Sequence, residues 1–229
     1  MPSFQVLVRL AAVPGGAGRQ AAALARAVVE RQARVALGWN VADLGEGGQS
    51  VGLTWKRTED RKPYLAECPE FSFSVSYTRR HVGVAFAGPA GGPERAGGPD
   101  WARDLGAVTC GLDLELVGRT VNLALADRFA ADERDYILSG PSDLTGQRLL
   151  DVWTKKEAYL KWLGVGMRAG LGSFTVLDPV ALGVGFLGLA PGLADGLIGH
   201  VCVERPVAAA CAGGVREEWL DRLDGASSL

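Results

Sequence analysis

A strict alternation of apolar and other side chains runs through residues 108–116 and constrains the fold more than any other feature. Every second position is apolar: Val108, Cys110, Leu112, Leu114 and Leu116. Successive side chains of a β-strand point to opposite faces, so this pattern predicts a half-buried strand. Asp113 and Glu115 fall between the apolar positions and therefore share the polar face. Two neighbouring carboxylates repel each other unless a cation or a proton lies between them.

A helical pattern follows in residues 146–163. Its apolar stripe consists of Leu149, Leu150, Trp153 and Leu160. Glu157 and Lys161 are four residues apart and hence neighbours on one helix face. Adding Glu157 to the strand carboxylates gives an oxygen-rich set that suits a hard divalent ion such as Mg²⁺. Taken separately, the motifs have ordinary alternatives, namely a solvated strand end and an exposed helix pair worth roughly 0.2–0.5 kcal/mol.

The flanking residues extend these two motifs into a longer signature. Its parts are Gly111-Leu112-Asp113-Leu114-Glu115, Arg128-Phe129, Glu133 and Trp153-x-x-Lys156-Glu157-Ala158-x-x-Lys161. Together they resemble the 4′-phosphopantetheinyl transferases, in the larger single-chain class whose best-known member activates surfactin synthetase. Two weaker matches lie upstream, in residues 61–65 and residues 73–77. The resemblance runs from about residue 19 to residue 212.

This resemblance implies an α+β fold of two similar halves, related by a pseudo-twofold axis, with the active site in the cleft between them. The halves would be residues 1–105, which contact coenzyme A, and residues 106–229, which carry the Mg²⁺ and catalytic residues. A Gly- and Pro-rich stretch, residues 88–99, would be the loop between them.

Local patterns predict a similar element order in each half. In the first we expect a strand at 4–10, a helix at 19–37 and strands at 51–56, 71–76 and 82–86. In the second we expect a strand at 107–116, helices around 121–138 and 146–163, and strands at 174–177, 196–204 and 207–212.

The activity implied by the resemblance is transfer of the 4′-phosphopantetheine arm of coenzyme A to a serine of an apo acyl or peptidyl carrier protein, with release of 3′,5′-ADP. Asp113, Glu115 and Glu157 correspond to the family's Mg²⁺ carboxylates. Lys161 corresponds to the catalytic lysine beside the pyrophosphate. Glu157 is also a candidate for accepting the serine proton.

The residues expected to contact coenzyme A are Arg19, Arg26, Arg61, Lys62, Ser76, Tyr77, Lys156 and Lys161. For the three arginines and Lys156, an exposed surface charge is an equally good interpretation. Tyr77 stands where the family usually has a histidine, so we expect coenzyme A to bind through fewer charges than usual. Arg79 and Arg80 could replace the missing charge or could form a solvent-facing turn. Trp153 and Phe129 are expected to pack in the core, and Glu133 has a surface interpretation as an alternative.

The composition of the chain excludes some classes of function. The net charge of −2 gives no basic footprint for nucleic acid. No apolar run reaches the roughly 18–20 residues of a membrane span, and the N-terminus does not resemble a signal peptide. We therefore expect a cytoplasmic monomer with four free, buried cysteines, whose carrier docks on an apolar surface near residues 121–138. Two alternatives stay open: a non-catalytic coenzyme A- or nucleotide-binding module, and a Mg²⁺-dependent pyrophosphohydrolase.

Overall fold

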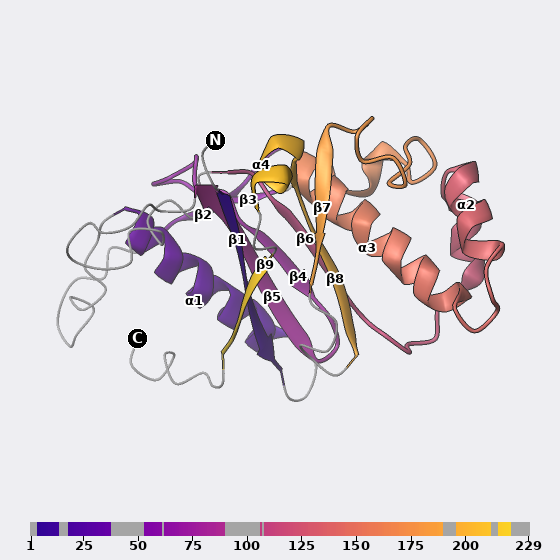
Figure 1. Cartoon of the computed structure of the whole chain (residues 1–229). Coiled ribbons are helices and arrows are strands. Elements are labelled where there is room, and N and C mark those ends of the chain that lie inside the picture. Colours follow the sequence, from indigo (N-terminus) through magenta and orange to yellow (C-terminus); the bar gives the residue numbers. More distant parts are fainter. Residues whose placement is uncertain are drawn as a thin grey trace.

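The computed structural model describes residues 4–13, 18–37, 53–60, 62–89, 106, 108–189, 196–211 and 215–220. Within these ranges the chain has a mixed α+β architecture with one four-stranded, one three-stranded and one two-stranded sheet (Figure 1). The expected α+β class is confirmed. None of the helices in the described ranges is both long and apolar enough to cross a bilayer.

The first sheet has the strand order β4 (Ser74–Tyr77), β5 (His81–Pro89), β1 (Phe4–Ala12) and β9 (Val215–Trp219). β5 runs antiparallel to both β4 and β1, whereas β9 runs parallel to β1. The helix α1 (Arg19–Ala36) packs on this sheet through a face rich in alanine and valine. Such small side chains allow a helix to lie close to a sheet.

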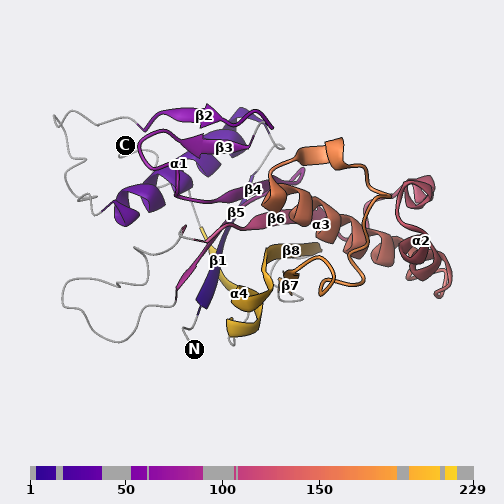
Figure 2. The same ribbon diagram turned by 90° about the horizontal axis from the view of Figure 1, so that it is seen from above.

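A short hairpin of β2 (Trp55–Arg57) and β3 (Pro63–Leu65) lies beside α1 (Figure 2). Two three-residue strands are marginal by themselves in water, so the hairpin depends on its neighbours. Leu65 is fully buried, and the Trp55 indole N–H donates to Glu30 of α1 over 2.8 Å. Trp55 also makes an edge contact with Phe73, with 5.3 Å between the ring centroids.

The second sheet has the strand order β6 (Gly111–Leu116), β8 (Leu197–Glu204) and β7 (Val184–Gly188). The long helix α3 (Thr145–Leu163) crosses it. Gly111 explains how closely they pack, because a Cβ there would collide with the backbone carbonyl of Ala158. The glycine of the motif thereby brings the Glu157 helix against the Asp113 strand.

The smaller helices complete this part of the fold. They are the 3-10 helices η3 (Leu123–Arg128) and η4 (Gly166–Ala169) and the α-helices α2 (Ala131–Leu138) and α4 (Arg205–Ala210). α2 contacts α3, and η4 follows the end of α3 at Gly164.

The two larger sheets share a topology. Each begins with a strand, continues with a helix and ends in an antiparallel strand pair whose second member lies next to the first strand. β1, β5 and β4 thus correspond in order to β6, β8 and β7. A twofold relation between the sheets stays a prediction. β9 comes from the end of the chain and extends the first sheet beside β1.

Several local predictions are wrong. The strand expected at 174–177 is irregular, and the one expected at 207–212 overlaps α4. Residues 71–73 precede β4 without strand pairing, and the helix expected at 121–138 is divided into η3 and α2. Residues 88 and 89, expected in a loop, end β5, while the rest of that stretch lies outside the described residues. The cysteine prediction is confirmed, because all four are free and buried.

Candidate functional site

A pocket of about 1050 Å³ lies between α1, the β2–β3 hairpin, β4 and the segment that joins α3 to η4. Six cationic side chains line it: Arg26, Lys56, Arg57, Lys62, Lys161 and Arg168. Among the described residues of its lining, Asp60 is the one acid. Clefts lined by one sign of charge concentrate ligands of the opposite sign. The pocket therefore suits a large polyanion.

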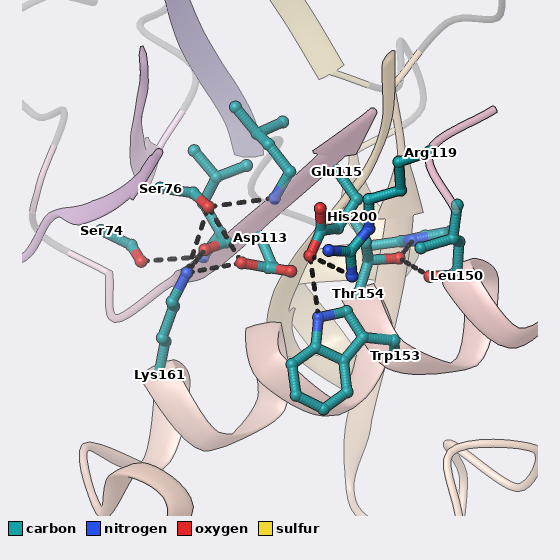
Figure 3. A network of polar contacts seen from close by, with 12 residues as sticks. Ser74, Ser76, Asp113, Glu115, Arg119, Leu150, Trp153, Thr154, Lys161 and His200 are labelled. Atoms are coloured by element: carbon teal, nitrogen blue, oxygen red, sulfur yellow. Dashed lines mark hydrogen bonds and ion pairs between the residues drawn. The ribbon is translucent and has the colours of Figure 1, made fainter. Parts of the chain in front are cut away.

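The Asp113 carboxylate is not part of the pocket lining but contacts Lys161, which is (Figure 3). Its Oδ1 atom accepts from Lys161 Nζ over 2.7 Å and from the Ser76 hydroxyl over 2.9 Å. Lys161 Nζ also donates to the Leu112 carbonyl over 2.9 Å. The second oxygen, Oδ2, is buried and has no hydrogen-bond partner within the described structure. A buried charged oxygen without a partner is costly, so this atom marks a place for a donor or a cation.

Two serines of β4 join the two larger sheets next to Asp113 (Figure 3). The Ser74 hydroxyl accepts from the Leu112 N–H over 2.8 Å, and the Ser76 hydroxyl accepts from the Leu114 N–H over 3.1 Å. Both hydroxyls thus take the place of strand carbonyls along the edge of β6. Ser76 links β4, Asp113 and Lys161, which makes it a positioning residue with no exposed hydroxyl of its own.

Glu115 is held next to the Asp113 position by two donors. Its Oε1 atom accepts from the Trp153 indole N–H over 3.1 Å and pairs with Arg119 over 3.0 Å. Burial raises the pKa of Glu115, and the Asp113 charge raises it further, while Arg119 lowers it. Trp153 stacks on Phe129, as the packing prediction expected, but its N–H also orients an acidic side chain.

Glu157 faces the same two carboxylates from α3. Burial raises its pKa, and the negative charge of Asp113 raises it further, whereas Lys161 acts in the opposite direction. Glu115 also raises the Glu157 pKa, so the three carboxylates lie within electrostatic range of one another.

In the described part of the chain, no three Asp, Glu, His or Cys side chains are arranged as a metal-binding group. The donor chemistry nevertheless fits a hard cation. Oxygen atoms are the ligands that Mg²⁺ prefers, and the Asp113 Oδ2 atom has no partner within the described structure. Bringing a cation to these carboxylates would also offset the repulsion that raises the pKa of Glu115 and Glu157.

His200 lies on β8, opposite Asp113 in the strand register, and ties this strand to α3 (Figure 3). Its Nδ1 atom is 2.8 Å from the Thr154 hydroxyl, and its Nε2 atom is 3.3 Å from Asp151 Oδ1. Burial lowers the pKa of His200 to about 4, so the ring is neutral near pH 7. The contact fixes the helix one turn before Glu157.

Lys156 does not lie in the pocket, contrary to the predicted coenzyme contact. It is fully buried and donates to Glu133 over 2.7 Å, to the Leu171 carbonyl over 2.7 Å and to the Phe174 carbonyl over 2.6 Å. Its three N–H groups are thus occupied inside the protein. The alternative of an exposed lysine is equally wrong, as is the surface interpretation of Glu133, because both side chains have no exposed area.

Only some of the other residues expected to contact coenzyme A line the pocket. Arg26, Lys62 and Tyr77 line the pocket. Arg26 lies over the Trp55 ring and pairs with Glu30 through its Nε atom over 3.1 Å.

The other arginines that the sequence analysis considered for coenzyme A binding do not line the pocket within the described structure. Arg19 is exposed and does not belong to the pocket lining. Arg79 and Arg80 are exposed in the turn between β4 and β5, in agreement with the solvent-facing interpretation. Arg61 lies outside the described residues.

Three pocket cations were not predicted from the sequence: Lys56, Arg57 and Arg168. The first two form a basic pair on β2, a pattern that is common on surfaces and therefore uninformative alone. Only the folded hairpin turns them toward the pocket. Arg57 adds positive charge near Tyr77, the position at which the family resemblance leads us to expect a histidine.

Comparison with known proteins bears on the acidic part of the site. Residues 109–187 match the family model of the 4′-phosphopantetheinyl transferase superfamily. This stretch contains Asp113, Glu115, Glu157 and Lys161.

A curated relative points to the same family. A stretch of 118 residues is 33% identical to the 4′-phosphopantetheinyl transferase psf-1 of Bacillus pumilus. The alignment covers 50% of this chain and 41% of that protein. The chain thus spans less than half the length of the relative it matches. The stretch that matches the family model nevertheless contains all four residues predicted for metal binding and catalysis.

Proposed function

We propose that this protein transfers the 4′-phosphopantetheine arm of coenzyme A to a serine of an apo acyl or peptidyl carrier protein. The observation that carries the proposal is the placement of Lys161 and Asp113. They form an ion pair of 2.7 Å inside the stretch that matches the family model, and Lys161 also lines the cationic pocket. A polyanionic substrate in the pocket would therefore reach the acidic cluster through Lys161.

In this reaction the serine oxygen forms a bond to the phosphorus that carries the pantetheine arm. The bond from that phosphorus to the bridging oxygen breaks, and 3′,5′-ADP leaves with the electron pair. Lys161 stabilises the charge that develops on the departing phosphate, and its present partner Asp113 positions the ammonium group. Glu157 takes the serine proton, and in the metal-free protein burial raises the pKa of its carboxyl above the ordinary value.

Asp113, Glu115 and Glu157 would hold Mg²⁺. When bound, the ion would neutralise charge on the pyrophosphate and help to align it. Trp153 and Arg119 orient Glu115 for this role, and Ser76 orients Asp113. These residues thus prepare the acidic cluster before the ion and the substrate arrive.

The cationic pocket would hold the nucleotide part of coenzyme A. Arg26 is pre-oriented by Trp55 and Glu30, which favours recognition of a phosphate by its free N–H groups. Tyr77 is 46% exposed at the pocket wall and can donate a neutral hydrogen bond. We further propose that the division between the coenzyme-binding and catalytic halves falls near residues 105 and 106.

The carrier protein would dock beside the acidic cluster on apolar side chains. Several large apolar residues between β6 and α3 are exposed: Val117, Leu123, Tyr136, Leu138 and Leu144. They lie on and around η3 and α2, where the apolar docking surface was predicted. Exposed apolar residues grouped on one region are typical of interaction surfaces.

The test incubates the protein with coenzyme A, Mg²⁺ and an apo carrier and measures the carrier by intact mass spectrometry. We expect the carrier to gain one phosphopantetheine arm, and Asp113→Asn or Glu157→Gln to remove nearly all of this gain. Glu70→Gln is the control, because Glu70 is exposed and outside the pocket lining. An unmodified carrier with intact coenzyme A would indicate a binding module, and hydrolysed coenzyme A would indicate a pyrophosphohydrolase.

A further inference from the structure

One ion pair joins η4 to the β2–β3 hairpin across the pocket. Arg168 Nη1 donates to Asp60 Oδ1 over 3.1 Å, and Arg168 Nη2 donates to the Glu59 carbonyl over 3.5 Å. Arg168 belongs to η4, whereas Asp60 lies in the turn of the β2–β3 hairpin. Both side chains line the pocket. The pair is therefore placed to fix the distance between two walls of the site.

The position of the β2–β3 hairpin depends on a small number of contacts, of which this ion pair is one. Its turn is closed by the Thr58 N–H donating to the Lys62 carbonyl over 2.9 Å and by the Lys62 N–H donating to the Thr58 hydroxyl over 3.1 Å. Lys62 Nζ reaches the Trp162 carbonyl over 3.4 Å, a weaker second link to the end of α3. Three-residue strands supply little stability of their own, so such links determine the position of the turn.

The same hairpin carries three of the six pocket cations. Lys56 and Arg57 lie on β2, and Lys62 directly precedes β3. The Lys62 side chain passes over Gly164, where a Cβ would lie 3.2 Å from its Cδ atom. Any shift of the hairpin away from η4 would move these cations relative to Lys161 on α3.

We propose that Arg168 and Asp60 form a latch that holds the β2–β3 hairpin cations in position for the polyanionic ligand. Both are positioning residues in this role. The inference rests on the proposed function, because that function supplies coenzyme A as the ligand. It assigns an acidic residue a favourable part in binding an anion, which simple charge attraction does not predict.

The direction in which Asp60→Asn changes coenzyme A affinity separates the latch from charge attraction alone. Removing the Asp60 charge makes the pocket more positive, so attraction alone predicts tighter binding of coenzyme A. The latch predicts weaker binding, because Arg168 loses its partner and the hairpin loosens. Removing the Arg168 charge weakens binding under both explanations.

The experiment measures coenzyme A binding by isothermal titration calorimetry without a carrier. We expect Asp60→Asn and Arg168→Gln each to weaken binding by up to about fivefold, the size typical of an exposed ion pair. The reversed pair, Asp60→Arg with Arg168→Asp, should bind within about twofold of the wild type because an equivalent pair forms. Tighter or unchanged binding by Asp60→Asn, or a reversed pair weaker than either single variant, would overturn the latch.

The matched control is a second exposed ion pair, Arg134 with Asp127, whose atoms are 2.9 Å apart outside the pocket lining. Asp127→Asn and Arg134→Gln should leave coenzyme A affinity unchanged. Weakening of the same size by these controls would show a general charge effect and overturn the latch.

Hydrogen exchange separates failure of the latch from failure of the proposed function. The Thr58 and Lys62 amides should exchange up to about fivefold faster in Asp60→Asn and Arg168→Gln than in the wild type. If the wild type binds no coenzyme A, the proposed function fails, while faster exchange would still show that the pair holds the hairpin. Unchanged exchange would overturn the latch whatever the protein binds.

Discussion

Replacing Lys156 with methionine should destabilise the protein strongly while its neighbour Lys155 tolerates the same change. Lys156 and Glu133 form an ion pair of 2.7 Å in which neither side chain has any exposed area. Methionine preserves most of the volume of lysine but removes its charge. The Glu133 carboxylate would then stay buried, with the backbone N–H groups of Ala130 and Val176 as its remaining donors in the described structure.

The expected magnitude follows from this burial. Breaking a buried ion pair by removing one partner costs about 3–5 kcal/mol, because the remaining charge loses its compensation. The loss of donors to the Leu171 and Phe174 carbonyls adds to the cost. A typical domain has only about 5–15 kcal/mol of stability in total, so the variant should retain a fraction of the original value.

The assay is urea unfolding followed by tryptophan fluorescence, with the free energy of unfolding taken from the midpoint and slope. Lys155→Met is the matched control, because Lys155 pairs with Asp151 on the same helix and these side chains are 23% and 24% exposed. Its loss should cost less than about 1 kcal/mol. The double variant Lys156→Met with Glu133→Leu should recover part of the loss, since no buried charge remains. Equal small losses for Lys155→Met and Lys156→Met would refute the reasoning.

Three further predictions concern the site. Ser76→Ala should lower kcat more than it raises KM for coenzyme A, because the hydroxyl orients Asp113 and Lys161 and leaves no exposed donor for the substrate; a pure KM effect in steady-state kinetics would contradict this. Tyr77→His should keep activity and tighten coenzyme A, and Tyr77→Phe should weaken it modestly; unchanged affinity in both would place Tyr77 outside the binding site. Burial raises the pKa of Glu157 above its ordinary 4.5, so the folded protein binds this proton more tightly than the unfolded protein does. The stability of the metal-free protein should therefore fall as pH rises from the unfolded-state pKa to the folded-state pKa of Glu157. Glu157→Gln should make the urea midpoint, measured without metal, depend less on pH in this range.

The acidic part of the site was predictable because its residues obey local rules. Asp113 and Glu115 share one strand face, and Glu157 and Lys161 share one helix face. Gly111 then brings these two elements together by removing a Cβ that would strike α3. Strand period, helix period and one obligatory glycine are all visible in the sequence.

The charged network around Lys156 was not predictable, because it depends on tertiary contacts between distant segments. Lys156 and Glu157 are adjacent, yet one is buried against Glu133 and the other faces the acidic cluster. A lysine with no exposed area contradicts the usual expectation for its type, and only the partner explains it. The irregular segment containing Phe174 was mistaken for a strand for the same reason, since its carbonyl bonds to Lys156 instead of to a strand.

The pocket cations on the hairpin depend on long-range structure as well. Lys56 and Arg57 occupy a three-residue strand whose hairpin contacts distant segments through Trp55, through Lys62 and through the ion pair with Arg168. Short strands carry little periodic information, so the sequence pattern could not place them.

The central claim is that the acidic cluster and the cationic pocket act together to transfer the phosphopantetheine arm to a carrier. The most direct test quantifies both products in one reaction, 3′,5′-ADP by chromatography and modified carrier by intact mass spectrometry. We expect the two products in equal amounts, and neither when the carrier serine is replaced by alanine. Formation of 3′,5′-ADP at an undiminished rate with the alanine carrier, or without any carrier, would contradict the transfer mechanism.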